Sequence, residues 1–322
     1  MKGFLNRAAA VFLLLLMLPQ TAAAARLLVP VGEVIGISLE DNTVTVAAFD
    51  EALGSTARKA GLRVGDKILR IDNIKITSAE DIHTALIQSD GVVDVEILRG
   101  DKCKRIKLCP EITQDGPKLG IYLKQGITGV GTVTWYDPES GAFGALGHGV
   151  NTQEGKLVKM HGGTVYPASV VSVKKGLPGT PGQLMGAMES SIPLGTLTKN
   201  TEQGLFGTCS KGFQGVSMPA AEAEQIQTGP AYIRSTVLGQ EVQEYSVEIL
   251  KIYPTSRSDG RNMLLQVTDP ELLGATGGIV QGMSGSPIIQ DGKLVGAVTH
   301  VLVNDPTTGY GIFIENMLDA AA

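Results

Sequence analysis

The stretch Gly282-Met283-Ser284-Gly285-Ser286-Pro287 decides how the larger part of this chain folds. A serine hydroxyl becomes a strong nucleophile when a tight turn presents its Oγ, a base takes its proton and backbone N–H groups face the developing oxyanion. Gly282 and Gly285 allow backbone shapes that a Cβ would block. We therefore interpret residues 282–287, called the serine turn below, as a nucleophile turn with Ser284 as nucleophile. The predicted oxyanion-hole donors are the N–H groups of Gly282 and Ser284.

Two other interpretations of the serine turn are an ordinary Gly-Ser loop between strands and the G-x-S-x-G elbow of α/β-hydrolases. The elbow does not fit, because residue 286 is Ser. A plain loop needs no accompanying base, so the remaining sequence has to distinguish the two cases.

Composition indicates a mainly β protein with two domain cores. The chain has 322 residues, of which 43% are hydrophobic and 41 are glycine. That length suits two domains at ~100–200 residues each. Glycine-rich turns between short apolar runs are typical of sandwiches and barrels. The net charge of −5, without a long basic run, gives no support for nucleic-acid binding.

Residues 1–25 have the pattern of a secretory signal peptide. Lys2 and Arg7 precede an apolar run over residues 8–18, and alanines at 22–25 offer small-residue cleavage sites. The run is shorter than the ~20 residues that span a bilayer. We expect a signal peptide, with an uncleaved signal anchor as the alternative, and an exported remainder.

The three cysteines do not suggest a metal or a disulfide framework. Cys103 and Cys109 lie in one alternating segment, where six strand residues span ~20 Å, well beyond the ~7 Å limit for a disulfide. Cys209 could pair with neither of them, or with one across domains. No Cys/His cluster has metal-ligand spacing. We expect free or buried thiols, no metal and no cofactor.

Residues 28–113 form the first predicted domain. The string A-G-L-R-V-G-D-K-I-L-R-I-D at residues 60–72, followed by a helix that Ser78 and Asp81 would cap, resembles a PDZ domain of the bacterial protease-associated type. Such domains bind a peptide end by adding it as a strand. The resemblance places the carboxylate-binding loop at Val34, Ile35, Gly36 and Ile37. Alternatively, this domain only packs on its neighbour.

Residues 116–322 contain many short β-like runs between glycine-rich turns, with helices expected at 219–227 and 314–321. Their length and the serine turn resemble chymotrypsin-like peptidases. The predicted fold is therefore mainly β: an N-terminal PDZ domain followed by a chymotrypsin-like double β-barrel serine peptidase domain.

The nucleophile needs a base, and His148 is the best of the four histidines. It lies in Gly-Ala-Leu-Gly-His-Gly-Val at residues 144–150, where glycine on both sides allows a closely approached ring. The alternative is a core histidine without catalytic function. His300, in the strand after the serine turn, is the second candidate base, although a binding or structural role suits it better.

Asp269 is the candidate for the third catalytic residue, which would orient the imidazole. It precedes Pro270 and Glu271, so a helix N-cap with proline at the first helical position is a strong alternative. Asp137 and Asp305 are weaker candidates.

The chain closely resembles the SpoIVB peptidases, which are PDZ-containing serine peptidases of endospore-forming bacteria. The motifs that carry this resemblance are residues 144–150, 269–273, 276–281, 282–287, 296–300, 304–306 and 309–311. By these motifs His148 and Ser284 match the catalytic pair, and Asp269 matches the third residue.

The resemblance implies a signalling peptidase in the forespore intermembrane space. Its partners would be a peptide or protein substrate, namely a membrane-bound inhibitor of an intramembrane metalloprotease, and a PDZ peptide ligand from its own chain or another. It would cleave itself and trigger processing of a late sporulation sigma factor. Two alternatives are an inert peptidase-like protein that binds partners through its PDZ domain, and a general quality-control protease.

Overall fold

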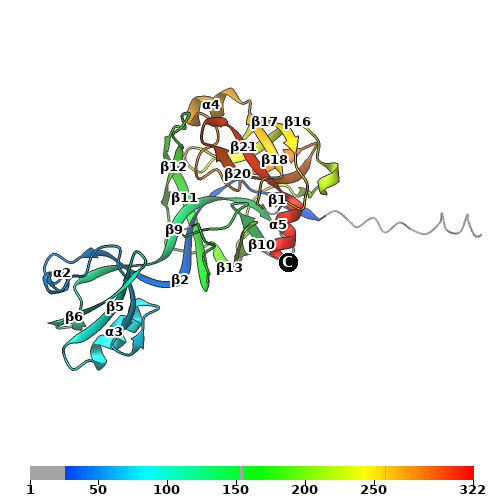
Figure 1. Cartoon of the computed structure of the whole chain (residues 1–322). Helices are drawn as coiled ribbons and strands as arrows, with labels where there is room; N and C mark the ends of the chain where they lie inside the picture. The colour runs from blue at the N-terminus through cyan, green and yellow to red at the C-terminus, as the bar shows by residue number, and fades with distance from the viewer. Residues whose placement is uncertain (1–25, 153–154, 258) are drawn as a thin grey trace, which may run out of the picture.

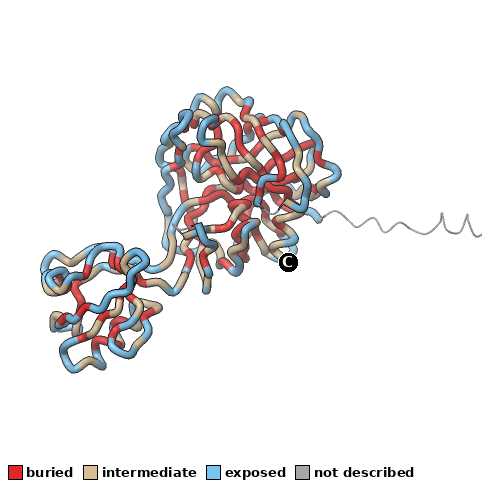
Figure 2. Tube along the Cα trace, in the orientation of Figure 1, coloured by how far each residue is buried: buried red, intermediate tan, exposed pale blue. Residues whose placement is uncertain are grey.

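A computed structural model describes residues 26–152, 155–257 and 259–322 of the chain. It is mainly β and consists of two barrels and a smaller unit, which projects from the barrels on two long strands (Figure 1). The predicted fold is confirmed. Buried residues gather inside the barrels and, separately, inside the smaller unit (Figure 2). The predicted signal segment, residues 1–25, lies outside the described residues.

The first barrel closes because its strands form a ring of pairings that starts and ends at the same strand. Inward-facing apolar residues such as Ile35, Val133 and Phe143 fill its core. The strands, in order around the barrel, are β2 (Val34–Phe49), β9 (Ile121–Tyr136), β10 (Ala142–Ala145), β14 (Gly204–Cys209), β13 (Gly195–Thr201) and β11 (Gly162–Lys174).

The second barrel is closed as well, and its strands alternate between buried and exposed residues, as in Tyr245, Val247 and Ile249 of one strand. Helix α4 (Pro270–Thr276) precedes the serine turn, and α5 (Ile314–Ala321) ends the chain, as predicted for residues 314–321. The strands, in order, are β16 (Gly229–Thr236), β17 (Val242–Ile252), β18 (Met263–Val267), β21 (Asp305–Phe313), β20 (Lys293–Leu302) and β19 (Pro287–Gln290).

The smaller unit packs two helices on strands around its own core. Ser78 accepts a hydrogen bond from the Asp81 amide, while the Asp81 carboxylate accepts from Ser78, so the predicted capping box is present. Its elements, besides the outer parts of β2 and β9, are α2 (Ser55–Ala60), β3 (Lys67–Ile71), β4 (Ile74–Lys75), α3 (Ala79–Gln88), β5 (Val93–Arg99), β6 (Lys102–Leu108), β7 (Glu111–Thr113) and β8 (Gly116–Lys118).

The boundary between the two domains differs from the predicted one. The first part of β2 belongs to the first barrel, its second part belongs to the smaller unit, and β9 returns from that unit to the barrel. The smaller unit is thus inserted into the barrel. The β2–β9 register shifts between Leu39 and Val44, and Gly126 has a φ of +70°, where a Cβ would overlap the carbonyl of Leu39. Nothing local in the sequence of β2 shows that its two halves pack in different cores, which concealed this insertion.

The remaining elements are short. β1 (Leu27–Pro30) pairs with β9 and with β15 (Met218–Pro219), and β12 (Gln183–Met188) forms a hairpin with β11. The helix predicted at 219–227 is wrong, because only the 3-10 turn η1 (Ala223–Gln225) forms there. Among the described residues, no helix is long and apolar enough to cross a membrane.

Candidate active site

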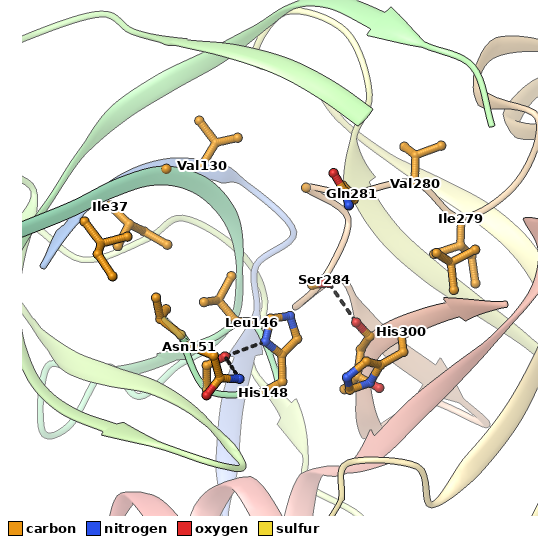
Figure 3. Close-up of a pocket in the computed structure, with 17 residues that line it drawn as sticks. Ile37, Val130, Leu146, His148, Asn151, Ile279, Val280, Gln281, Ser284 and His300 are labelled. Carbon is orange, nitrogen blue, oxygen red and sulfur yellow. Dashed lines mark hydrogen bonds between the residues drawn. The ribbon is translucent and has the colours of Figure 1, made fainter. Parts of the chain in front are cut away.

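A cavity of about 530 Å³ lies where the two barrels meet, and both Ser284 and His148 line it (Figure 3). The first barrel and its loops contribute His148 and Asn151, and the second contributes Gln281, Ser284 and His300. The other side chains are mostly aliphatic. They are Ile37, Ile127, Val130, Leu146, Val150, Ile279, Val280, Thr299 and Val301.

The serine turn adopts backbone shapes that require glycine at two positions. Gly282 and Gly285 have φ values of +100° and +99°. A Cβ on Gly285 would overlap the carbonyl of Thr132 and lie 2.6 Å from the amide of Leu146. The fully buried Met283 side chain anchors the turn in the second barrel. The turn is therefore fixed against both barrels.

Two buried threonines of β9 hold the serine turn from the first barrel. Thr132 donates its Oγ1–H to the Gly282 carbonyl at 2.8 Å and its N–H to the Ser284 carbonyl at 3.2 Å. Thr134 donates its hydroxyl to the Gly285 carbonyl at 2.7 Å. We did not predict these residues. The only sequence signal is a pair of threonines at alternating positions in an apolar strand.

The N–H groups of Gly282 and Ser284 donate to no acceptor within the described ranges of the chain. Both residues line the cavity. Unpaired N–H groups beside a hydroxyl nucleophile are what oxyanion stabilisation requires.

The segment leading to His148 is strained and closely packed. Leu146 has a φ of +70°, a genuine outlier for a bulky residue, and Gly147 follows at +68°. A Cβ on Gly147 would lie 2.9 Å from the Thr299 side chain of the second barrel. Strain of this kind persists only where surrounding contacts enforce it, and it concentrates at functional sites.

Asn200 fixes the segment that follows His148. Its side-chain oxygen accepts the Val150 N–H at 2.9 Å, and its amide group donates to the carbonyls of Val150 and Val158 at 2.9 and 3.0 Å. This residue was also missed, since an asparagine in a polar strand gives no distinctive signal.

The half-buried His148 ring is held in the tautomer that a general base needs. Its Nδ1 lies 2.9 Å from the Gly149 carbonyl oxygen. A carbonyl only accepts, so Nδ1 carries the proton and Nε2 of the neutral ring keeps its lone pair. Burial lowers the pKa of His148, and the Gly149 contact opposes part of that shift. The ring is therefore neutral at neutral pH.

The Ser284 hydroxyl points to the second barrel. It donates to the Thr299 carbonyl on β20 at 2.8 Å (Figure 3), and no hydrogen bond to His148 exists in the described structure. For Oγ to reach His148, it must first leave the Thr299 carbonyl. Long or misaligned catalytic hydrogen bonds are common without substrate.

Asp269 does not orient His148, so its prediction as the third catalytic residue is wrong for this structure. It is the N-cap of α4: its carboxylate accepts the N–H groups of Glu271 at 2.9 Å, Leu272 at 3.0 Å and Ser246 at 3.2 Å. It does not line the cavity. Asp269 therefore has the helix N-cap role that the Asp-Pro-Glu sequence offered as the alternative.

The two weaker aspartate candidates also have other partners. Asp137 forms an ion pair with Arg26 at 2.7 Å, which opposes its desolvation and holds its pKa below the usual value. Asp305 accepts hydrogen bonds from Thr307 and Thr308, which lower its pKa.

His300 lies across the cavity from His148. The ring centroids are 5.4 Å apart, and the planes make an angle of 41°. Desolvation, together with the nearby His148 and Arg261, lowers the pKa of His300 to about 4. Its Nδ1 is buried without a partner among the described residues. His300 thus stays neutral and lines the cavity.

The carboxylate-binding loop predicted at Val34, Ile35, Gly36 and Ile37 is wrong. These residues lie in β2 within the first barrel, where β9 pairs along one edge and β11 along the other. An added peptide strand needs an unpaired edge. Residues 121–125 of β9 have such an edge: they pair only with β2 in the described structure.

A double β-barrel in which a serine on a glycine-containing turn and a histidine line one cavity defines the chain as a serine peptidase. The model of the family described as SpoIVB peptidase S55 matches residues 115–318. The chain belongs to this family, as its motifs indicated. A PDZ domain model matches residues 51–99, within the inserted unit.

Among solved structures, the Rv3671c protease is similar in its inactive form, at 15% identity and a TM-score of 0.36, covering 60% of this chain and 84% of that one. A serine-to-alanine mutant of Rv3671c from M. tuberculosis H37Rv, also inactive, has 15% identity and a TM-score of 0.33 over 60% and 81%. Both likenesses are distant. No curated protein matches the chain.

Proposed function

We propose that this chain is an exported serine endopeptidase with Ser284 as nucleophile and His148 as base. One observation carries this assignment: the two side chains come from different barrels and open onto one cavity, with the imidazole tautomer fixed so that Nε2 is free. Asp269 has no part in it. The Gly149 carbonyl orients the ring instead of a carboxylate.

The reaction is acyl transfer to Ser284 followed by hydrolysis. Oγ leaves the Thr299 carbonyl, passes its proton to Nε2 of His148 and attacks the peptide carbonyl carbon. The N–H groups of Gly282 and Ser284 stabilise the oxyanion. The C–N bond then breaks as His148 protonates the leaving amine, and a water molecule, deprotonated by His148, releases the acyl group.

The cavity favours apolar substrate side chains. Among the described residues that line it, the only ionisable side chains are two histidines that burial keeps neutral. Burying an unpaired charge in such a site is costly. Residues flanking the cleaved bond should therefore be uncharged.

The physiological substrate that we propose is a membrane-bound regulatory protein that inhibits an intramembrane metalloprotease. Its cleavage, together with self-cleavage of this chain, would trigger processing of a late sporulation sigma factor. Membership of the SpoIVB family supports this role and a location in the forespore intermembrane space. The signal-like residues 1–25 support export and attachment to a membrane.

The inserted PDZ unit supplies a second peptide site in this proposal. The free edge of β9 at residues 121–125 can accept a peptide strand, from this chain or from another protein. Exposed Tyr122 and Lys124 alternate along this edge with Leu123, which packs on the unit's core.

Labelling with a fluorophosphonate probe tests the assignment. Wild-type protein should be labelled at Ser284, and Ser284→Ala should lose labelling and self-cleavage while keeping its thermal transition. The N-termini of both proteins, read by mass spectrometry, report self-cleavage. Proteolysis retained by Ser284→Ala would overturn the assignment, and a folded but unlabelled wild type would identify an inert binding protein.

A further inference from the structure

The strand β12 has one edge that is only partly used. On one side it pairs with β11 along its length. On the other side it meets Gln281, which donates its N–H to the Gly182 carbonyl at 3.0 Å and accepts the Leu184 N–H at 2.8 Å. Gln281 thus occupies the first place of a third strand. The chain then turns away at Gly282 toward Ser284. The outer edge of β12 beyond Leu184 is therefore left without a neighbouring strand in the described structure.

The directions of the backbone N–H groups along the unpaired part of β12 follow from their neighbours. The N–H of Glu189 donates to the Pro167 carbonyl, so it faces the hairpin, and the Leu184 N–H faces Gln281. Successive strand residues alternate in direction. The N–H groups of Gly186 and Met188 therefore point outward, and neither has an acceptor in the described parts of the chain.

The open edge adjoins the cavity. A Cβ on Gly186 would lie 2.7 Å from Cγ1 of Val130, whose side chain lines the cavity. Met185 and Met188 are 48% and 46% exposed. Edge strands are usually protected by lysine, proline or a covering element. The sequence of β12, Gln-Leu-Met-Gly-Ala-Met, contains neither residue.

We infer that the outer edge of β12, at residues 184–188, binds the substrate polypeptide as an added strand beyond the bond held at Ser284. An extended peptide placed there extends the strand pairing that Gln281 makes with β12. Its carbonyl groups accept the N–H groups of Gly186 and Met188. Met185 and Met188 flank it with flexible apolar surface that adapts to different side chains. This inference rests on the proposed peptidase function.

Continuity with the catalytic cavity favours substrate over a second copy of the chain. Gln281 lines the cavity and also pairs with the outer edge of β12. The edge is therefore an extension of the site that holds the cleaved bond. Pairing of two β12 edges would instead produce a dimer, which sedimentation detects.

The test compares Met188→Pro with Met188→Ala on a twelve-residue peptide selected by cleavage from a random library, and on its truncation to four residues around the cleaved bond. Proline removes the outward N–H but none of the hydrogen bonds to β11. The proline control is Gln114→Pro in the exposed turn between β7 and β8. Fluorophosphonate labelling and circular dichroism monitor Ser284 and the fold of each variant.

We expect Met188→Pro to raise KM for the long peptide about three- to tenfold, the effect of one net hydrogen bond, and to change KM for the short peptide much less. Met188→Ala should raise KM for the long peptide less than Met188→Pro does, and Gln114→Pro should leave this KM unchanged. Equal KM for Met188→Pro and wild type on the long peptide, with labelling intact, overturns the inference. So does loss of a dimer in Met188→Pro without a change in KM.

A second measurement does not depend on folding of the variant. Long peptides methylated at single backbone amides cannot donate to the Leu184 and Gly186 carbonyls at the methylated position. KM should rise at alternate amides on one side of the cleaved bond, and a flat profile contradicts strand addition. A wild type that is not labelled at all would instead refute the proposed function.

Discussion

The Ser284 hydroxyl donates its hydrogen bond to the Thr299 carbonyl, 2.8 Å away, and not to His148. The acceptor lies in β20 of the same barrel as Ser284, whereas His148 comes from the other barrel. In the proposed mechanism only the Ser284 side chain has to move, because Thr132 and Thr134 hold the turn itself.

The pH dependence of hydrolysis should follow the protonation of His148. Burial places the pKa of this ring below its ordinary value of 6.5. A base works unprotonated, so kcat/KM should rise with pH through a value below 6.5 and be level at neutral pH. Rates of fluorophosphonate labelling between pH 4 and 8 measure this. His148→Ala should reduce labelling by about a thousandfold or more. An acid limb centred above 6.5 contradicts the assignment.

His300→Phe should make stability less dependent on pH in the acid range. The folded-state pKa of His300 is about 4, below the ordinary 6.5. Between these values the unfolded chain binds a proton that the folded protein does not, so stability falls as pH drops from 6.5 toward 4. Phenylalanine removes that contribution and also the unpartnered buried Nδ1. Urea unfolding at pH 7 and pH 5 measures the effect, with the exposed His83→Phe as control. The prediction is contradicted if the free energy of unfolding changes equally between pH 7 and pH 5 in wild type and His300→Phe.

Thr132→Val should impair catalysis beyond its effect on stability. It leaves the Gly282 carbonyl without its 2.8 Å partner, which costs about 1–3 kcal/mol for a buried group. It also frees the turn that carries the oxyanion donors, so kcat should fall about tenfold or more. The control is Thr236→Val: this buried threonine donates to the Gly32 carbonyl, which is not part of the serine turn. Similar kcat values for the two variants at matched stability rule out a positioning role for Thr132.

Asp269→Ala should reduce stability and leave hydrolysis nearly unchanged. Loss of an N-cap costs about 1 kcal/mol. A triad aspartate would instead cost about 10⁴-fold in kcat on substitution. Urea unfolding and kcat of the same preparation distinguish the two roles. Ser78→Ala, at the N-cap of α3, should show a comparable loss of stability. A large fall in kcat for Asp269→Ala alone would restore the catalytic interpretation.

The sequence by itself determined the class of fold and the nucleophile candidates. Glycines at 282 and 285 flank a serine in the pattern of a nucleophile turn, and both have the positive φ that this pattern predicts. The capping box of Ser78 and Asp81, and the string at residues 60–72, identified the PDZ unit, because caps and tight turns are local. Local chemistry of this kind can be read without knowing the fold.

Only the tertiary structure decided how the units connect and which groups surround the serine. Strand pairing joins segments far apart in the chain, so the sequence of β2 could not show where the barrel ends or that residues 35–37 are paired on both edges. The sequence allows Asp269 to be either a catalytic residue or a helix N-cap. The three backbone N–H groups that its carboxylate accepts identify it as the N-cap. Thr132, Asn200 and the open edge of β12 act through partners distant in the chain. Their roles depend on pairings between strands, which no local pattern encodes.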